Sequence, residues 1–210
     1  MGTHASLVTA ADTAFTQSYL DAVKEIAARL DVEAIERMVA VLAEVREAGG
    51  RVFFVGVGGG AANASHAVND FRKIAGMECY APSDHIAELT ARINDEGWEC
   101  SYAQWLRGSR LSARDALFVF SVGGGSLEQR VSVNLVESLR LAGRVGARIL
   151  GVVGRDGGYT AQAAEACVVV PVVSGDAVTP HTEEFQSVVL HLLVSHPRLK
   201  MERTRWESLR

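Results

Sequence analysis

Short apolar runs that alternate with helix-like segments are the feature of this sequence that most restricts its fold. Apolar runs occupy residues 51–57, 77–82, 116–122, 148–154 and 167–173, and helical or mixed segments follow them at 61–75, 84–106, 126–146, 160–166 and 182–196. A continuous apolar run is typical of a strand covered on both faces. This alternation predicts an α/β fold built from parallel βαβ units, with ligands bound at the carboxyl ends of the strands.

The chain begins differently, with two predicted helices over residues 10–48. Phe15, Tyr19, Val23, Ile26 and Leu30 recur at steps of three and four residues, so the first helix carries an apolar stripe. This stripe is expected to pack on another helix, either of its own chain or of a neighbour. We expect one domain over residues 1–210, with N-terminal helices (1–50), an α/β core (51–197) and a tail (198–210).

Composition excludes several classes of protein. The 210 residues carry a formal net charge of −4, which leaves no basic footprint for direct nucleic-acid binding. The three cysteines, Cys79, Cys100 and Cys167, are widely spaced and odd in number, which argues against a disulfide framework. No basic start with an apolar core marks a signal peptide, and no apolar run is long enough to span a membrane. We therefore expect a cytoplasmic protein that does not contact membranes.

The first glycine cluster fits the pattern G-x-G-x-x-A from Gly56 to Ala61, between a predicted strand and a helix. That pattern is found in dinucleotide sites, which also need an acidic residue after the second strand. Asp84 stands near that place. The fold does not open with this strand, however, because two helices precede it. The dinucleotide interpretation is therefore the weaker one.

The second glycine cluster follows the strand at 116–122 and comprises Ser121, Gly123, Gly124, Gly125 and Ser126. We predict that a long helix begins at Ser126 or just after it. Backbone N–H groups at a helix N-terminus, with glycines that let an anion approach, would form a phosphate site. An ordinary turn with Ser126 as the N-cap is the alternative.

Two pairs of side chains could carry chemistry. His66 and Asp70 are four residues apart on one predicted helix, and Glu183 and His191 are eight apart on the last one, so each pair lies roughly on one helix face. The four could bind a divalent metal such as Zn²⁺ or transfer protons. A hydrogen-bonded core histidine is the other explanation for His191, and the spacing alone does not bring the two helices together.

Four stretches together resemble a known family: "FFVGVGGGAANASHAVNDF", "FVFSVGGGS", "RILGVVGRDGG" and "VTPHTEEFQSVVLHLL". In order and spacing they are similar to a SIS (sugar isomerase) domain, and most similar to the phosphoheptose isomerases, over nearly the whole chain. The resemblance implies an αβα sandwich around a five-stranded parallel sheet of flavodoxin-like order. It also implies a homotetramer with active sites between subunits, which would explain the apolar first helix.

The resemblance further implies an aldose–ketose isomerase that acts on sedoheptulose 7-phosphate or a similar sugar phosphate through an enediol. Asp70 and His191 would transfer the proton, and one zinc ion would be held by His66, Asp70, Glu183 and His191. The expected substrate- and phosphate-binding residues are Gly58, Gly59, Gly60, Asn94, Asp95, Ser121, Gly123, Gly124, Gly125, Ser126 and Glu183.

The chain departs from the family at several of these positions. Asp70 replaces a glutamate, Glu183 replaces a glutamine, and "SVGGGS" replaces a loop richer in hydroxyl groups. These changes suit an altered substrate. They also leave a second hypothesis open, in which the chain is a non-catalytic tetrameric adaptor or a sugar-phosphate-binding regulator. The four ligand-type side chains argue against this second hypothesis, since an adaptor does not need them.

Overall fold

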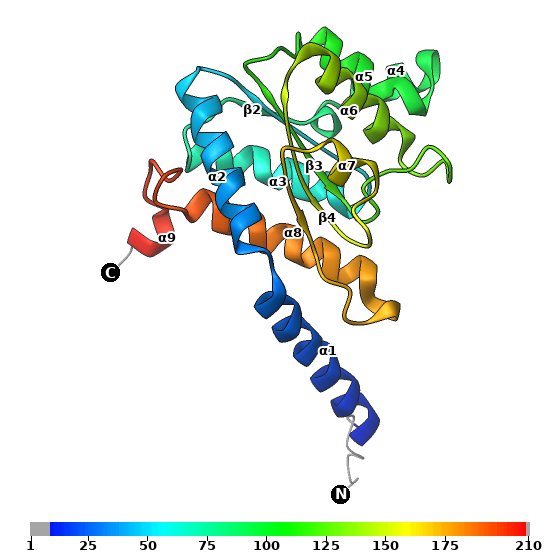
Figure 1. Cartoon of the computed structure of the whole chain (residues 1–210), viewed down its shortest axis with the longest axis vertical. Coiled ribbons are helices and arrows are strands. Elements are labelled where there is room, and N and C mark those ends of the chain that lie inside the picture. Colours follow the sequence, from blue (N-terminus) through cyan, green and yellow to red (C-terminus); the bar gives the residue numbers. More distant parts are fainter. Residues whose placement is uncertain (1–8, 209–210) are drawn as a thin grey trace, which may run out of the picture.

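The computed structural model describes residues 9–208 and shows three layers, with a parallel sheet between two sets of helices (Figure 1). The sheet order is β2-β1-β3-β4-β5, the flavodoxin order expected from the resemblance. The strands are β2 (Cys79–Tyr80), β1 (Val52–Gly56), β3 (Ala116–Ser121), β4 (Arg148–Val153) and β5 (Ala166–Val169). Every neighbouring pair is parallel.

Each face of the sheet packs on its own set of helices because the central strands are apolar on both sides. On one face Phe54, Phe118 and Phe120 pack against the helices α2 (Val32–Glu47), α3 (Gly59–Lys73) and α8 (Val178–Ser195). On the other face Phe53 and Val119 pack against α5 (Trp98–Gly108), α6 (Val133–Val145) and α7 (Gly158–Ala163). The alternation along the sequence thus correctly predicted a doubly covered sheet.

The remaining elements lie at the margins. The helix α4 (Ile86–Glu96) has no buried residue and follows the short 3₁₀ helix η1 (Pro82–Asp84). A second 3₁₀ helix, η2 (Gly175–Ala177), leads into α8, and a short α-helix, α9 (Arg205–Ser208), lies within the predicted tail. None of the helices within residues 9–208 is long and apolar enough to cross a membrane.

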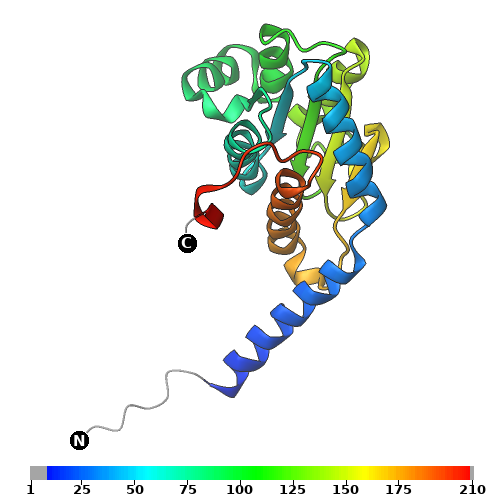
Figure 2. The same ribbon diagram turned by 90° about the vertical axis from the view of Figure 1, so that its left-hand side faces the viewer.

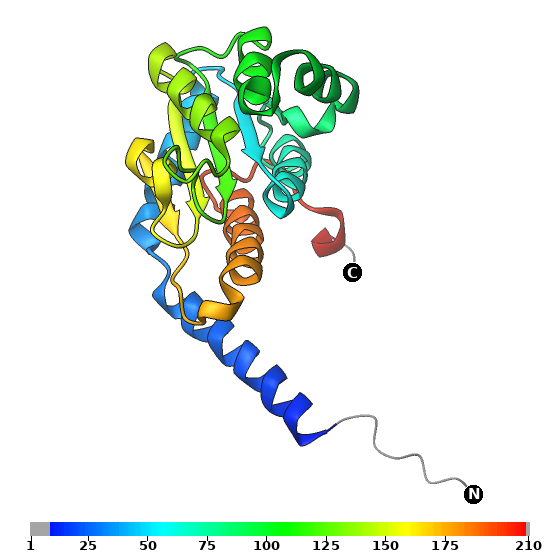
Figure 3. The same ribbon diagram turned by 90° about the vertical axis from the view of Figure 1, so that its right-hand side faces the viewer.

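The first helix, α1 (Ala10–Arg29), extends away from the body of the molecule (Figures 2 and 3). Thr9 caps its start, with a reciprocal hydrogen bond between the Thr9 and Asp12 side chains and backbones. Ile26 is fully buried at its carboxyl end, but Phe15 is 71% exposed and Leu20 is 50% exposed. The apolar stripe therefore contacts its own chain from Tyr19 onward, where the Tyr19 ring centroid lies 4.4 Å from that of His181, and it leaves Phe15 exposed.

Candidate active site

Three side chains from two helices converge beside the sheet. His66 and Asp70 lie one turn apart on α3, and His191 faces them from α8. Asp70 Oδ2 lies 3.2 Å from His66 Nε2 and 3.5 Å from His191 Nε2, and the two Nε2 atoms are 3.4 Å apart. The fold thus brings together two helices whose contact the sequence could not establish.

This donor set fits a zinc ion. With bonds of about 2.0–2.1 Å, any two ligands of a tetrahedral zinc lie about 3.3 Å apart. The three separations among Asp70 Oδ2, His66 Nε2 and His191 Nε2 are 3.2, 3.5 and 3.4 Å, close to that value. Two imidazole nitrogens and one carboxylate oxygen also leave a fourth position for a water or a substrate, as in catalytic zinc sites. His66, Asp70 and His191 are therefore the residues that could hold the metal.

The three side chains differ in exposure. The Asp70 side chain is 13% exposed, whereas those of His66 and His191 are 46% and 52% exposed. Asn69 donates a hydrogen bond of 2.8 Å to Asp70 Oδ1, so Oδ2 is the oxygen that faces the imidazoles. The cluster has its carboxylate inside and its imidazoles outside, and a small molecule would approach it from the imidazole side.

Hydrogen bonds between α3 and α8 hold the two histidine-bearing helices in register. Asn63 donates to the backbone oxygen of Glu183 (3.0 Å) and to Gln186 Oε1 (2.9 Å), and its own Oδ1 accepts from the Ser187 hydroxyl (2.9 Å). Asn63 lies one turn before His66, and Ser187 lies one turn before His191. Neither Asn63 nor Ser187 was predicted as a site residue, because an asparagine and a serine within helical patterns give no signal until the two helices meet.

Glu183 does not join the histidines within one chain. It lies eight residues before His191 on α8, about 12 Å along the helix axis. Its carboxylate lies over Gly59, so close that a Cβ on Gly59 would come within 2.3 Å of Glu183 Oε2. Glu183 therefore faces the first turn of α3, and among the described residues the potential metal ligands of one chain are three rather than the predicted four.

The first glycine cluster has a packing role. A Cβ on Gly60 would lie 2.4 Å from the backbone oxygen of Phe120, and one on Gly56 would lie 2.3 Å from the Gly60 carbonyl carbon. These glycines let α3 begin directly against the ends of β1 and β3. Gly58, the N-cap of α3, has φ +60°, a conformation that favours glycine. Gly58, Gly59 and Gly60 thus form the turn at the point where the strand order reverses.

The helix that follows the second glycine cluster starts later than predicted. The long helix α6 begins at Val133, not at Ser126, and the segment between them is a loop in which Ser126 and Val131 form an isolated antiparallel bridge. A helix-like pattern predicted the wrong boundary because Ser132 adopts a left-handed conformation (φ +49°) that interrupts the helix. Ser126 therefore does not cap α6; its hydroxyl accepts a hydrogen bond from the Gln129 backbone.

The glycines of this loop pack against the start of α7. Gly124 and Gly125 accept hydrogen bonds from the backbones of Thr160 (3.0 Å) and Tyr159 (2.9 Å), and the Thr160 hydroxyl also donates to Gly124. The Ser121 hydroxyl accepts from the Gly124 backbone at 3.1 Å. The loop carbonyls thus satisfy the N-terminus of α7, and an anion would have to bind on the opposite side of the loop.

The true N-terminus of α6 adjoins this loop. A Cβ on Gly125 would lie 3.4 Å from the Ser132 backbone oxygen, so the loop abuts the start of the helix. In the first turn, Asn134 is fully buried, and neither its Nδ2 nor its Oδ1 has a partner among the described residues. Asn134, like Asn63 and Ser187, was not predicted, because the predicted helix placed it in an interior turn.

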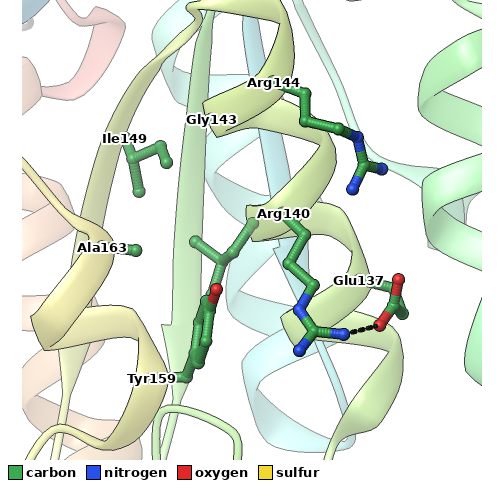
Figure 4. Close-up of a pocket in the computed structure, with 8 residues that line it drawn as sticks. Glu137, Arg140, Gly143, Arg144, Ile149, Tyr159 and Ala163 are labelled. Carbon is green, nitrogen blue, oxygen red and sulfur yellow. Dashed lines mark hydrogen bonds and ion pairs between the residues drawn. The ribbon is translucent and has the colours of Figure 1, made fainter.

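Asn94 and Asp95 lie on the exposed α4, where the Asn94 amide donates to the Asp95 carboxylate at 2.7 Å. A hollow of about 620 Å³ lies between α6 and α7, and it is lined by Arg140 and Arg144 from α6 and by Ile149 from β4 (Figure 4). Arg140 is paired with Glu137 at 2.8 Å. This hollow shares no residue with the predicted site.

Comparison with known proteins identifies relatives in sequence. Residues 15–154 match the family of the SIS domain. The phosphoheptose isomerase of Akkermansia muciniphila is 30% identical over 164 residues, covering 76% of this chain and 81% of that protein. The lincomycin biosynthesis protein LmbN of Streptomyces lincolnensis is 32% identical over 166 residues, covering 74% of this chain but 57% of LmbN.

The fold has counterparts among solved structures. Phosphoheptose isomerase GmhA from Neisseria gonorrhoeae superposes with a TM-score of 0.74 at 22% identity, covering 87% of this chain and 94% of that one. At this identity the likeness concerns the arrangement of the elements, and it extends beyond the residues that the SIS family match covers.

Proposed function

Because the chain belongs to the SIS domain family and, within it, to the phosphoheptose isomerases, we propose that it interconverts sedoheptulose 7-phosphate and D-glycero-D-manno-heptose 7-phosphate. Family membership makes the chain a sugar-phosphate isomerase; the sugar and the mechanism are our proposal. The observation that supports it most is the convergence of His66, Asp70 and His191 at separations of 3.2–3.5 Å.

Two of these side chains would move the protons. The Asp70 carboxylate removes a proton from C1 of the ketose and delivers it to C2, while the His191 imidazole transfers a proton between the oxygens on C1 and C2. An enediol lies between the two steps. Asp70 would serve both as a metal ligand and as the base, and it has one oxygen for each role, since Oδ2 faces the histidines and Oδ1 faces Asn69.

His66, Asp70 and His191 would hold a zinc ion, which when bound polarises the substrate carbonyl. Glu183 is proposed to act on the substrate rather than on the metal of its own chain. Its carboxylate lies against Gly59 at the start of α3, where it would accept hydrogen bonds from sugar hydroxyl groups. The turn of Gly58, Gly59 and Gly60 would border the same part of the sugar.

The phosphate would bind at the loop of Ser121, Gly123, Gly124, Gly125 and Ser126, completed by the start of α6. This placement moves the predicted anion site from a helix at Ser126 to the helix that begins at Val133. The first N–H groups of a helix attract anions. The unpartnered buried amide of Asn134 supports a polar ligand here, since a buried polar group without a partner costs about 1–3 kcal/mol. Asn94 and Asp95 would border the sugar from α4.

We further propose that the active enzyme is a cytoplasmic homotetramer with the site between subunits. Val188 and Leu192, which flank His191 on α8, are 47% and 39% exposed. Apolar side chains beside a half-exposed cluster suit burial by a second copy, as do Phe15 and Leu20 on α1. The adaptor hypothesis is not favoured, because an adaptor has no need of converging metal ligands.

Nuclear magnetic resonance with sedoheptulose 7-phosphate in D₂O, with and without Zn²⁺, tests this function. We expect an aldose phosphate that carries deuterium at C2, and a loss of about 10³-fold in rate for Asp70→Asn and His191→Gln. His196→Gln, at the end of the same helix but outside the cluster, is the matched control and should keep full activity. A zinc-loaded tetramer that exchanges no deuterium would contradict the proposal.

A further inference from the structure

The turn after β4 holds an arginine that the proposed mechanism does not use. Arg155 occupies the second position of this turn, which the Gly157 N–H closes on the Gly154 carbonyl at 2.9 Å. The Gly154 N–H donates to the Val122 carbonyl at 3.0 Å, just beyond the carboxyl end of β3. The turn is therefore fixed beside the second glycine cluster, where the phosphate is proposed to bind.

The Arg155 side chain reaches that cluster at Gly123. A Cβ on Gly123 would lie 3.9 Å from Arg155 Cδ, in ordinary van der Waals contact. The guanidinium is bonded directly to Cδ, so its positive charge lies next to the glycine loop. Arg155 is exposed, and its side chain makes neither an ion pair nor a hydrogen bond within residues 9–208. A small anion at the loop could therefore pair with it.

The loop itself has hydrogen-bond donors without acceptors. The carbonyls of Gly124 and Gly125 accept from the start of α7, and the Gly124 N–H donates to the Ser121 hydroxyl. The N–H groups of Gly123 and Gly125, by contrast, have no acceptor within the part of the chain that the structure describes. Free N–H groups in a glycine-rich loop are typical of phosphate sites.

A phosphate also brings negative charge, which backbone donors do not neutralise. A phosphate monoester carries a charge of about −1.5 to −2 at pH 7, whereas the serines and glycines of the loop are uncharged. Arg130, which follows the loop, is paired with Glu99 from α5. Arg155 has no such partner, so it can supply the missing positive charge.

The backbone conformation of Arg155 does not by itself indicate a function. Its φ of +53° favours glycine, but Arg110, just after α5, has φ +56° as well. The Arg110 carbonyl accepts from the Arg51 guanidinium at 2.9 Å, and Arg51 directly precedes β1, so Arg110 lies at the amino ends of the strands. Contact with the glycine loop distinguishes Arg155, and Arg110 provides a matched control.

We propose that Arg155 binds the phosphate group of the substrate, an assignment that rests on the proposed sugar-phosphate isomerase function. A guanidinium can donate two parallel hydrogen bonds to phosphate oxygens, and the free N–H groups of Gly123 and Gly125 donate to the same group. The phosphate on C7 is remote from C1 and C2, between which the proton moves. Arg155 therefore contributes equally to binding of the substrate and of the transition state, and it is a binding residue rather than a catalytic one.

Equilibrium dialysis with sedoheptulose 7-phosphate tests the proposal on the full chain, because it measures bound phosphate whether or not the sugar is converted. Arg155→Gly should weaken binding about tenfold, and Arg110→Gly should leave both binding and activity unchanged. Both variants should unfold near the wild-type temperature, since glycine adopts a positive φ without strain. Arg155→Lys keeps the charge but loses the planar fork, so its affinity should lie between those of wild type and Arg155→Gly.

Two further measurements separate a phosphate contact from a structural role. In Arg155→Gly the Michaelis constant should rise about tenfold while kcat stays within about twofold. The affinity of this variant should also depend less on salt concentration than that of the wild type, because one ion pair is missing.

Equal affinity of wild type and Arg155→Gly for the sugar phosphate overturns the proposal, and so does an equal loss in Arg110→Gly. A wild type that binds no sugar phosphate overturns it together with the proposed function. If Arg155→Gly weakens binding although the wild type exchanges no deuterium in D₂O, the role of Arg155 stands and the isomerase function fails.

Discussion

Asn63 shows how a single side chain can fix the geometry of the cluster. It makes three hydrogen bonds to α8, and Asn63→Ala removes all three while leaving the Oε1 atom of the fully buried Gln186 without its partner. We expect a loss of about 2 kcal/mol in the free energy of unfolding and weaker zinc binding. Urea titration and a zinc competition assay measure these.

The control for this change is on the same helix. Asn69→Ala removes an exposed asparagine that reaches its neighbour Asp70 but not α8, so stability should change little. If Asn63→Ala and Asn69→Ala lowered the free energy of unfolding equally, the hydrogen bonds between α3 and α8 would not hold the helices in register.

Asp115 is the buried charge on which stability should depend most. Burial raises its pKa, but hydrogen bonds from Arg51 and Ser112 outweigh this and hold the pKa below the ordinary 3.8. The folded state therefore gains stability above about pH 4 and loses it as pH falls through the lowered folded pKa. The side chain is 3% exposed and lies 2.9 Å from Arg51.

Asp115→Asn should thus cost about 3 kcal/mol near neutral pH, and the gap between variant and wild type should narrow as the pH is lowered below 3.8. Urea unfolding over a pH series provides the measurement. Glu137→Gln, in an exposed ion pair with Arg140, should match wild type throughout. A gap that stayed constant down to pH 2 would refute the assignment.

The side chains of the candidate site were easier to predict than the residues that surround them. His66, Asp70 and His191 were predicted because their chemistry is distinctive and their spacing puts two of them on one helix face. Asn134 and Asn63 were missed, because the role of an asparagine depends on its burial or on its contact with a second helix. Neither can be read from one segment of the sequence.

The loop between β3 and α6 was predicted wrongly as the start of the helix. A substitution at Gly124 tests how this loop packs. Gly124 has φ +68°, and a Cβ there would lie 1.9 Å from the Gly157 backbone oxygen. Gly124→Ala should therefore destabilise the protein by at least about 2 kcal/mol and disorganise the proposed phosphate loop. Thermal unfolding and the Michaelis constant for the sugar phosphate measure the two effects.

Gly143→Ala, in the helix that follows this loop, should have the opposite effect on stability. Gly143 lies inside α6, and a Cβ there would meet no atom within 4 Å. Alanine should stabilise the helix by about 0.5–1 kcal/mol. Should Gly124→Ala be as stable as Gly143→Ala, the packing of the loop against α7 would be wrong.

The three central strands β1, β3 and β4 were predicted well because a continuous apolar run is stable where helices cover both faces of the sheet. The edge strands β2 and β5 are shorter than predicted. The start of α6 was not predicted, because residues 126–132 repeat apolar side chains at helical steps yet form a loop. What decides the boundary is the left-handed backbone of Ser132 and the contact of Gly125 with the helix start. Both are consequences of tertiary packing.

At the scale of the whole molecule, the exposed apolar side chains of α1 and α8 predict the assembly. Phe15→Glu combined with Leu20→Glu should convert the proposed tetramer into smaller species, because two charges would replace apolar contacts at the interface. Light scattering coupled to size-exclusion chromatography measures the mass. Met201→Glu, at another exposed apolar residue (64%), should leave the mass unchanged, and a double variant that stayed tetrameric would exclude α1 from the interface.

The layered architecture could be predicted almost completely from the sequence, since the alternation of strands and helices specifies a doubly wound sheet and the resemblance specified its strand order. The reach of α1 away from the body could not, because an apolar stripe does not reveal whether its partner belongs to the same chain.

The contact between α3 and α8 also has a consequence for synthesis. His66 and His191 are separated by 125 residues, and β3, β4 and β5 are made between them. On the ribosome, where domains form as the chain emerges at about 5–20 residues per second, α3 is complete several seconds before its partner helix exists. A nascent chain can therefore bury much of its sheet while it still lacks the proposed metal site, and zinc uptake at that site would report that the last helix has docked.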